Sequence, residues 1–437
     1  MPGSDAAVPV PGAGASLQDW LTYLESIHPV EIELGLERVL LVMRRLLPAG
    51  VRSRVVTVGG TNGKGSTVAA LEALLLRAGR SVGCYTSPHL LDYNERVRVN
   101  GQPVSDDVLI RAFDQVEAAR GRVSLTYFEF GTLAAFLAMV EAEVDTMVLE
   151  VGLGGRLDAV NILDADLAII TSVDLDHMAW LGDDRETIGY EKAGILRPGQ
   201  RAIYGDDSPP SSVLQQAAAQ RVQLSRPGQD YRIDHEPSGP TLVTATGHRI
   251  PLPASGLPLN SLAAAAVAAL ELEPDLSDDA IAGILATTRL AGRFEQVIRA
   301  PEVYLDVGHN PHAAQWLAHR LTALKRGQTD RRVLAVYAGL EDKDSAGVGQ
   351  ALSAVVDQWY LAGLGVPRGL PVTALAERLQ GVLPAAGIVT SATVSEALER
   401  ALAQSRENDL VLVFGSFFTV VEGKRYFSRQ PGLTVPL

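Results

Sequence analysis

The stretch Val55–Thr67, VVTVGGTNGKGST, decides the fold of this chain. It begins as a β-branched run, turns through glycines around Lys64 and leads into the apolar, helix-favouring segment VAALEALLLRAG. A strand, a glycine-rich turn and a helix N-terminus bind phosphate, because backbone N–H groups close around the anion and the helix dipole favours negative charge. The strict pattern G-x-x-x-x-G-K-[ST] is not met, since Val58 replaces its first glycine and Gly65 follows the lysine. The alternative is a tight strand–helix turn with a solvated lysine, but the flanking elements favour a nucleotide phosphate site.

Length and composition indicate a soluble protein of two or three domains. The chain has 437 residues, of which 47% are hydrophobic and 20% charged. No apolar run is long enough to span a membrane. Residues 1–16 are rich in Pro, Gly and Ala and lack a basic start, so we expect a loose tail and not a signal peptide.

Charge and cysteine content exclude two further classes. The net charge of −13 argues against a nucleic-acid-binding surface but leaves anionic small molecules open as substrates. The only cysteine, Cys84, excludes an internal disulfide, and we expect a cytoplasmic protein with this thiol buried in a strand.

Alternating strands and helices predict an α/β protein. Helices are expected within Leu17–Leu46, and buried parallel strands at Asp145–Gly152 and Asp166–Val173. Each of these strands ends in polar residues, which is where open α/β sheets bind ligands. Residues 227–257 predict a small antiparallel appendage.

A second series of strands and helices begins at Val303 and predicts a separate doubly wound domain. We place the boundary within Ala291–Gln296, which gives an N-terminal domain of residues 1–292 and a C-terminal domain of residues 293–437.

Acidic residues at strand ends predict a metal site beside the phosphate loop. Glu150 follows one strand, and Asp174, Asp176 and His177 follow another. Magnesium takes few protein ligands and completes its octahedron with water and phosphate oxygens. A histidine ligand is unusual for magnesium, so the residues alone favour an acid–base or structural role for His177 over metal binding. A histidine that is only hydrogen-bonded at a strand end is an equal alternative to a functional one.

The C-terminal domain offers a second polar group at a strand end. Asp306, His309 and Asn310 follow its first strand, and Arg293 lies near the junction. These residues predict an ATP-dependent enzyme with a ligand cleft between two α/β domains, although an ordinary capped loop would have the same composition. Gly415 and Ser416 are likewise either a site or a strand-end turn.

A series of ordered motifs carries a specific family resemblance. The motifs are Gly60–Ser66, Ser87–Leu90, Tyr93–Gly101, Leu125–Glu129, Glu150–Asn161, Asp174–His177, Glu186–Ile195, Gly292–Glu295, Asp306–Ala313, Asp342–Asp344 and Gly415–Phe417. Together they resemble the bacterial bifunctional dihydrofolate synthase/folylpolyglutamate synthases of the Mur ligase superfamily. The chain departs from that family at Gly308, where Ala is usual, and at Ala291, where Pro is common. It also departs in the sequence AGLEDKD, which ends at Asp344.

The resemblance implies a fold and a nucleotide site. The fold is a P-loop nucleotide-binding domain, similar to the Mur ligase central domain, followed by a Rossmann-like C-terminal domain. The implied ATP-binding residues are Thr61, Asn62, Gly63, Lys64, Asn260, Arg293 and Asp306.

The resemblance also implies a metal site, with two Mg²⁺ ions. Its implied ligands are Ser87, Glu150, His177 and Lys192, of which Lys192 matches a lysine that the family carries as a carbamate. A bare ammonium would repel Mg²⁺, whereas a carbamate presents an anionic oxygen to the ion. Without the resemblance, the preferred interpretation of Lys192 would be a solvated lysine on a helix. Lys64, His177 and Lys192 are the implied catalytic residues.

The implied substrates are dihydropteroate, reduced folates and L-glutamate. The implied pterin-site residues are Thr126, Tyr127, Phe128, Glu129, Leu157, Asp158 and Ala159, closed over by the segment IELGLER, and His309 and Ser416 are assigned to glutamate. We expect a monomer without nucleic-acid or membrane partners. Two alternatives are less consistent with the sequence. A cell-wall Mur ligase would need a uridine-diphosphate-binding domain before the phosphate loop, where this sequence has only about 50 residues. A non-catalytic nucleotide-binding scaffold would not need Lys64, Glu150, His177 and Lys192.

Overall fold

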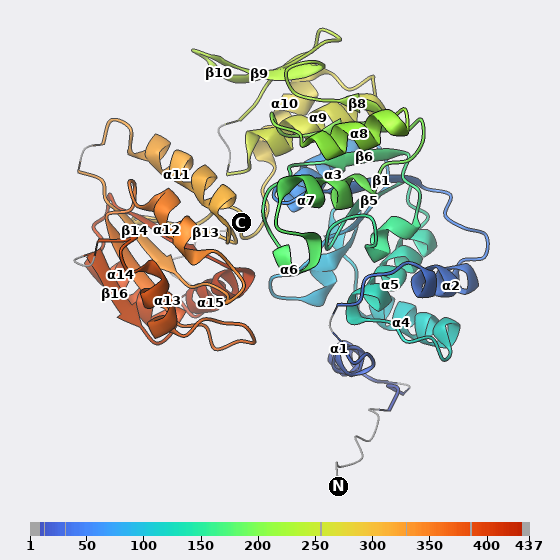
Figure 1. Cartoon of the computed structure of the whole chain (residues 1–437), viewed down its shortest axis with the longest axis horizontal. Helices are drawn as coiled ribbons and strands as arrows, with labels where there is room; N and C mark the ends of the chain where they lie inside the picture. Colours follow the sequence, from blue (N-terminus) through green and yellow to red (C-terminus); the bar gives the residue numbers. More distant parts are fainter. Residues whose placement is uncertain are drawn as a thin grey trace. The chain divides into compact units, whose positions relative to one another are not determined.

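A computed structural model describes residues 9–12, 14–30, 32–253, 256–328, 330–384 and 387–430. The predicted tail at residues 1–16 therefore lies largely outside the described residues. The chain divides into two compact units, the first formed by Met1–Ala254 with Leu259–Thr288 and the second by Ser255–Pro258 with Arg289–Leu437. Both are α/β in architecture (Figure 1). Within the described residues, no helix combines the length and the apolar character needed to cross a membrane.

An eight-stranded sheet organises the first unit, in the order β4-β3-β2-β5-β1-β6-β7-β8. The strands from β2 to β8 in that order are parallel, and β3 and β4 add an antiparallel edge. Their bounds are β1 Arg54–Gly59, β2 Val82–Tyr85, β3 Val97–Val99, β4 Gln102–Pro103, β5 Thr146–Glu150, β6 Leu167–Ile170, β7 Arg201–Tyr204 and β8 Gln223–Ser225. The buried parallel strands predicted around residues 146–150 and 167–170 are confirmed.

Helices cover this sheet and complete its core. The helices are α1 Leu17–Ser26, α2 Glu37–Leu46, α3 Lys64–Arg77, α4 Asp106–Arg120, α5 Tyr127–Glu141, α6 Met178–Leu181, α7 Arg185–Ala193, α8 Ser211–Ala219, α9 Leu259–Leu272 and α10 Asp278–Thr287, with 3-10 turns η1 Tyr93–Arg96 and η2 Ala159–Ile162. Apolar side chains of α1, α2, α4 and α5 share one core cluster with β5. Figure 1 shows helices α2, α4 and α5 close together. Helix α5 is buried along most of its length, which agrees with its apolar composition.

The predicted antiparallel appendage is a three-stranded sheet in the order β11-β10-β9. Its strands are β9 Tyr231–Glu236, β10 Gly239–Thr244 and β11 Arg249–Pro251. Tyr231 donates a hydrogen bond from its hydroxyl to the carbonyl of Tyr204, and His248 Nδ1 lies 2.7 Å from Asp278 Oδ1. These contacts tie the appendage to β7 and α10.

The second unit is built on a six-stranded sheet in the order β12-β13-β17-β14-β15-β16. Its strands are β12 Glu295–Arg299, β13 Glu302–Asp306, β14 Val333–Tyr337, β15 Gln358–Ala362, β16 Ile388–Ser391 and β17 Leu410–Phe414. Its helices are α11 Pro311–Lys325, α12 Ser345–Leu352, α13 Val372–Leu379, α14 Val394–Gln404 and α15 Phe417–Ser428. All pairs are parallel except β12 with β13. The parallel series therefore begins with β13, as predicted from Val303, and β12 adds an antiparallel strand at the edge of the sheet that was not predicted.

Candidate active site

The phosphate loop lies between the end of β1 and the start of α3. Gly63 is the N-cap of α3 and has φ +90°, and Gly60 has φ +139°, so both use the left-handed region that favours glycine. A Cβ at Gly60 would lie 1.9 Å from Thr171 Oγ1, and one at Gly63 would lie 2.5 Å from Ser261 Oγ. The two glycines therefore let the loop backbone pass closely against β6 and α9, and they leave the start of α3 open to an anion.

Hydrogen bonds hold this loop in place. Thr61 N donates to Ser172 O at 2.8 Å, and Asn62 N donates to Ser172 Oγ at 3.1 Å. Thr61 Oγ1 both donates to Asp174 O at 3.1 Å and accepts from Asp174 N at 3.0 Å. The loop is thus fixed to the segment that follows β6, which continues to His177.

Lys64 begins α3 and points back over the loop. Its Nζ donates to the carbonyls of Gly60 at 3.1 Å and Thr61 at 3.3 Å. Ser66 and Thr67 are buried, and Thr67 Oγ1 donates to Ser261 O at 3.5 Å. The hydroxyls of Ser66 and Thr67, which follow Lys64, are therefore buried. This agrees with the prediction that the metal is bound by other residues.

The strand order β2-β5-β1-β6 brings three predicted groups to one edge of the sheet. Ser87 follows β2 and donates its N–H to Glu150 Oε2 at the end of β5, at 3.2 Å. The phosphate loop follows β1, and Asp174–His177 follows β6. His177 is exposed, has φ +51° and caps α6, and its N–H donates to Asp176 Oδ1 at 2.8 Å.

Lys192 is a buried lysine on α7, with a relative exposure of 4%. Burial, followed by the positive charge of Lys64, lowers the pKa of Lys192 to about 7, while Asp176 and Asp158 partly oppose this. These electrostatic neighbours mean that Lys64, Lys192 and the two aspartates surround one small region. An amine that loses its proton near pH 7 is a nucleophile, so the site suits the predicted carbamate.

A glycine-rich loop joins the metal residues to the predicted pterin residues. A Cβ on Gly155 would lie 2.8 Å from Glu191 O and 3.0 Å from Lys192 O, so only glycine permits this approach to α7. Asp158 is buried and accepts from Leu153 N at 2.8 Å and Val160 N at 2.9 Å, and burial raises its pKa to about 6. The neighbouring Leu157 is half-buried and Ala159 is buried.

The predicted pterin residues at 126–129 form the N-terminus of α5. Thr126 is the N-cap and exchanges hydrogen bonds with Glu129, which is a capping box. Tyr127 lies under the guanidinium of Arg96, and burial raises the pKa of Tyr127 to about 12. The Phe128 ring packs against Gly152, because a Cβ there would lie 2.6 Å from the ring. One surface of the first unit thus combines both predicted substrate segments.

Asn260 is the remaining predicted ATP residue of the first unit. It is exposed in the first turn of α9, and its neighbour Ser261 donates to Gly63 O at 3.4 Å. The start of α9 is therefore directly beside the phosphate loop.

The predicted residues of the second unit gather at the ends of the adjacent strands β13 and β17. Asp306 is buried and accepts from Phe294 N at 2.8 Å and Gly308 N at 2.6 Å. Burial raises the pKa of Asp306, and the charge of Arg293 acts against that rise. The guanidinium of Arg293 lies 6.0 Å from the ring centre of Phe417 at the start of α15.

His309 and Ser416 both make local hydrogen bonds at this edge. His309 Nδ1 lies 3.0 Å from Val307 O. Ser416 is the buried N-cap of α15, and its Oγ accepts from Thr419 N at 3.0 Å. Its hydroxyl is therefore already used to start a helix.

The residues present fit a nucleotide with magnesium. Within the part of the chain that the structure describes, no group of three or more His, Cys, Asp and Glu side chains is arranged to hold a metal. The predicted ligand set contains only Glu150 and His177 of these types, as expected for a cation that takes most of its oxygens from phosphate and water.

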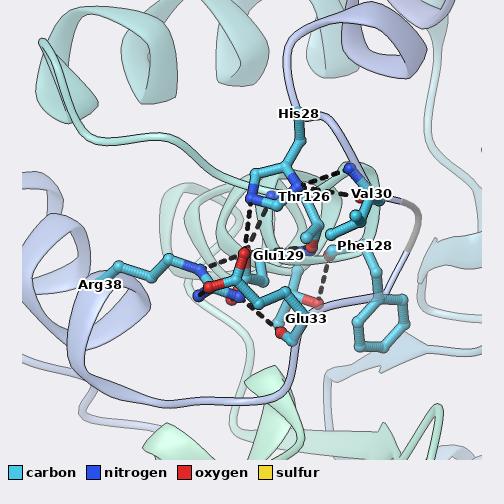
Figure 2. A network of polar contacts seen from close by, with 8 residues as sticks. His28, Val30, Glu33, Arg38, Thr126, Phe128 and Glu129 are labelled. Atoms are coloured by element: carbon cyan, nitrogen blue, oxygen red, sulfur yellow. Dashed lines mark hydrogen bonds and ion pairs between the residues drawn. The ribbon is translucent and has the colours of Figure 1, made fainter.

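Sequence patterns did not single out Arg38, which pairs with Glu129 at the start of α5 (Figure 2). The two residues are 91 positions apart, so only the fold reveals the pair.

Comparisons with known proteins give the same assignment for both units. Residues 58–268 match the Mur ligase middle domain, and residues 292–417 match the Mur ligase glutamate ligase domain. The chain is 45% identical over 412 residues to the dihydrofolate synthase/folylpolyglutamate synthase of Escherichia coli K12, covering 94% of this chain and 95% of the relative. It is 39% identical over 426 residues to the Haemophilus influenzae protein of the same name, and the match covers 94% of this chain and 97% of the relative.

Solved structures agree over the full length. Escherichia coli FolC in complex with DHPP and ADP superposes with a TM-score of 0.90 at 43% identity, covering 97% of this chain and all (100%) of that one. A bifunctional folylpolyglutamate synthase/dihydrofolate synthase with Mn, AMPPNP and L-glutamate bound superposes with a TM-score of 0.87 at 44% identity. The match covers 96% of this chain and 100% of that one. The chain belongs to the dihydrofolate synthase/folylpolyglutamate synthase family of the Mur ligases.

Proposed function

We propose that this chain ligates L-glutamate to dihydropteroate, forming dihydrofolate, and to tetrahydrofolate, forming folylpolyglutamates, with ATP as the energy source. The observation that carries the proposal is the single sheet edge that holds the phosphate loop and the Ser87–Glu150 pair, together with buried Lys192 on α7, whose pKa is lowered by burial and by the charge of Lys64 at that loop. Relatives that share at least 37% identity over nearly the whole chain bear both activities in their names, and solved relatives hold ADP, DHPP or glutamate.

The N-terminal domain assigned from the sequence, residues 1–292, binds the ATP phosphates and the pterin. Thr61, Asn62, Gly63 and Lys64 hold the phosphates, and Asn260, Arg293 and Asp306 contact the nucleotide. The exposed start of α9 beside Gly63 supports the role of Asn260. The pairing of charge between Arg293 and buried Asp306 supports a common role for these two residues.

Two Mg²⁺ ions would be held by Ser87, Glu150, His177 and a carbamate on Lys192. When bound, Mg²⁺ supplies positive charge to the phosphoryl oxygens. The lowered pKa of Lys192 supports the carbamate, because carbon dioxide reacts with the unprotonated amine. The carbamate also turns a repulsive pair of lysines into an attractive one, since Lys64 then faces an anion.

The pterin would lie along Thr126–Glu129 and Leu157–Ala159. Phe128 supplies a flat apolar surface, and Asp158 supplies a buried carboxyl that donates or accepts near neutral pH. Residues 293–437 bind glutamate, with His309 and Ser416 as the contacts. We expect the enzyme to be a cytoplasmic monomer, in keeping with its buried free thiol at Cys84.

The reaction has two steps. A carboxylate oxygen of the acceptor attacks the γ-phosphorus of ATP, the bond to ADP breaks, and an acyl phosphate forms. Lys64 stabilises the charge spread over the transferred phosphoryl oxygens, and the loop amides orient them. The α-amine of glutamate then attacks the acyl carbon, the amide forms and phosphate leaves with the electron pair of the broken C–O bond. Protein groups that exclude water protect the acyl phosphate from hydrolysis.

A drop-out assay tests this function. Phosphate release from ATP should require the acceptor and L-glutamate together, with dihydropteroate and tetrahydrofolate each supporting turnover when supplied alone. Turnover with tetrahydrofolate but not with dihydropteroate would reject the dihydrofolate synthase activity. Phosphate release at the full rate without glutamate would reject the ligase assignment.

A further inference from the structure

The segment between α1 and α2 is clasped to the first turn of α5. We call this segment the strap and define it as His28–Val30 together with Ile32–Arg38. Arg38 Nε donates to Glu129 Oε2 at 2.9 Å, and Arg38 Nη2 lies 2.8 Å from Glu129 Oε1. Figure 2 shows the strap curving around this pair. A planar fork that contacts both carboxylate oxygens fixes the direction as well as the distance of the contact.

Arg38 also forms hydrogen bonds within the strap itself. Its guanidinium donates to both the side chain and the backbone carbonyl of Glu33, in the middle of the strap. Glu33 Oε2 in turn lies 3.0 Å from His28 Nε2 at the start of the strap. One side chain thus connects both ends of the strap to α5.

Glu129 needs this partner because it is buried. Its side chain is 4% exposed, and its Oε2 already accepts from Thr126 N at 2.8 Å and Thr126 Oγ1 at 3.0 Å. A buried carboxylate that loses its cation is strongly unfavourable, so the fork is a stable contact and not a fluctuating surface pair. The segment Thr126–Glu129 is also the one assigned to the acceptor above.

The turn that Arg38 clasps carries an acceptor residue. Phe128 directly precedes Glu129 in the first turn of α5, and Figure 2 labels both residues together with Val30 and Glu33 of the strap. Thr126 and Phe128 belong to the same helical turn as Glu129. Release of the clasp would therefore change the wall of the acceptor site without touching the phosphate loop.

We infer that Arg38 is a positioning residue for the acceptor: through Glu129 and Glu33 it sets the strap against the turn that binds the pteridine ring. The inference rests on the proposed function for the identity of the acceptor. Arg38 therefore affects how tightly the acceptor binds, and it does not affect ATP binding, glutamate binding or the chemical steps.

The experiment compares Arg38→Met with two matched variants. Methionine keeps the apolar stem and removes the fork. Arg38→Met/Glu129→Gln removes the unpaired buried charge as well, and glutamine still serves in a capping box, so the turn stays folded. Arg120→Met is the control, because Arg120 makes a similar fork to Glu117 on α4, with side-chain exposures of 13% and 15%.

Arg38→Met should raise the KM for dihydropteroate by at least about tenfold, with kcat and the KM values for ATP and glutamate within about twofold of the parent. The double variant also changes an assigned acceptor residue, so it is compared with Arg38→Met by hydrogen–deuterium exchange alone. Hydrogen–deuterium exchange of the strap amides in ligand-free protein should rise about tenfold in the Arg38 variants and stay unchanged in Arg120→Met.

Unchanged strap exchange in Arg38→Met would overturn the clasp. Faster exchange with an unchanged acceptor KM, or an equal loss in Arg120→Met, would overturn the positioning role. Absence of turnover in the parent protein would reject the proposed function, and the exchange measurement would still decide the clasp.

Discussion

Replacing Lys192 with methionine should lower ligase turnover by about 100- to 1,000-fold, because it removes the carbamate anion of the proposed metal site, which is worth several kcal/mol in the transition state. The same change should stabilise the fold. Burial and the charge of Lys64 lower the pKa of Lys192 to about 7. At pH 7.5 about three quarters of such amines are neutral, against about one in a thousand for an ordinary lysine.

The sign of the stability change follows from proton binding. The unfolded chain holds the Lys192 proton up to its ordinary pKa of 10.5, whereas the folded chain releases it near 7. The unfolded state therefore binds more protons between these values, and stability rises with pH across that window. Below pH 7 the cost of burying the charged amine is fully present. Lys192→Met removes this cost, so the free energy of unfolding at pH 6 should rise by about 3 kcal/mol.

Turnover is measured with bicarbonate present and urea unfolding in buffer free of carbon dioxide, with Lys325→Met as the control in both. Lys325 is a partly exposed lysine that pairs with Asp357. Residues 1–288 contain only two lysines, Lys64 and Lys192, so ¹³C-bicarbonate should give one carbamate signal that disappears in Lys192→Met. Turnover within threefold of the parent would remove Lys192 from the metal site.

Replacing Lys64 with methionine should also lower turnover by about 100- to 1,000-fold, with the fold retained. Lys64 Nζ lies over the loop on the Gly60 and Thr61 carbonyls, so it is already placed where the phosphates enter. Removing its charge also removes a cause of the low pKa of Lys192. Formation of the carbamate should therefore require a higher pH in Lys64→Met than in the parent.

Single-turnover kinetics and ¹³C-bicarbonate titrations against pH check these two results. Arg77→Met is the control, since Arg77 is an exposed cation in the last turn of the same helix. Unchanged turnover in Lys64→Met would show that ATP binds elsewhere.

Local chemistry made much of the fold predictable. Continuous apolar runs predicted the parallel strands at Asp145–Gly152 and Asp166–Val173, which the structure contains as β5 and β6. Because parallel strands end at one edge, the neighbours of the phosphate loop could be expected from the strands alone. The antiparallel strand β12 was missed, because the segment Ala291–Gln296, where it begins, was taken as the boundary between the two domains.

The candidate site was less accessible to sequence reasoning where it depends on long-range contacts. The family resemblance supplied Lys192, but only burial beside Lys64 explains why this amine differs from an ordinary one. The fork between Arg38 and Glu129 depends on two helices that meet in the fold, and no spacing rule connects residues so far apart. The left-handed backbone of His177 is likewise a product of the turn into α6.

The most direct test of the ligase account follows oxygen and nitrogen in one incubation. Dihydropteroate labelled with ¹⁸O in its carboxylate is mixed with ATP, ¹⁵N-glutamate and the enzyme, and the products are analysed by mass spectrometry. The account predicts dihydrofolate that contains the labelled nitrogen, together with inorganic phosphate that carries one ¹⁸O atom from the acceptor. Phosphate without the label, or the absence of the amide product, would contradict it.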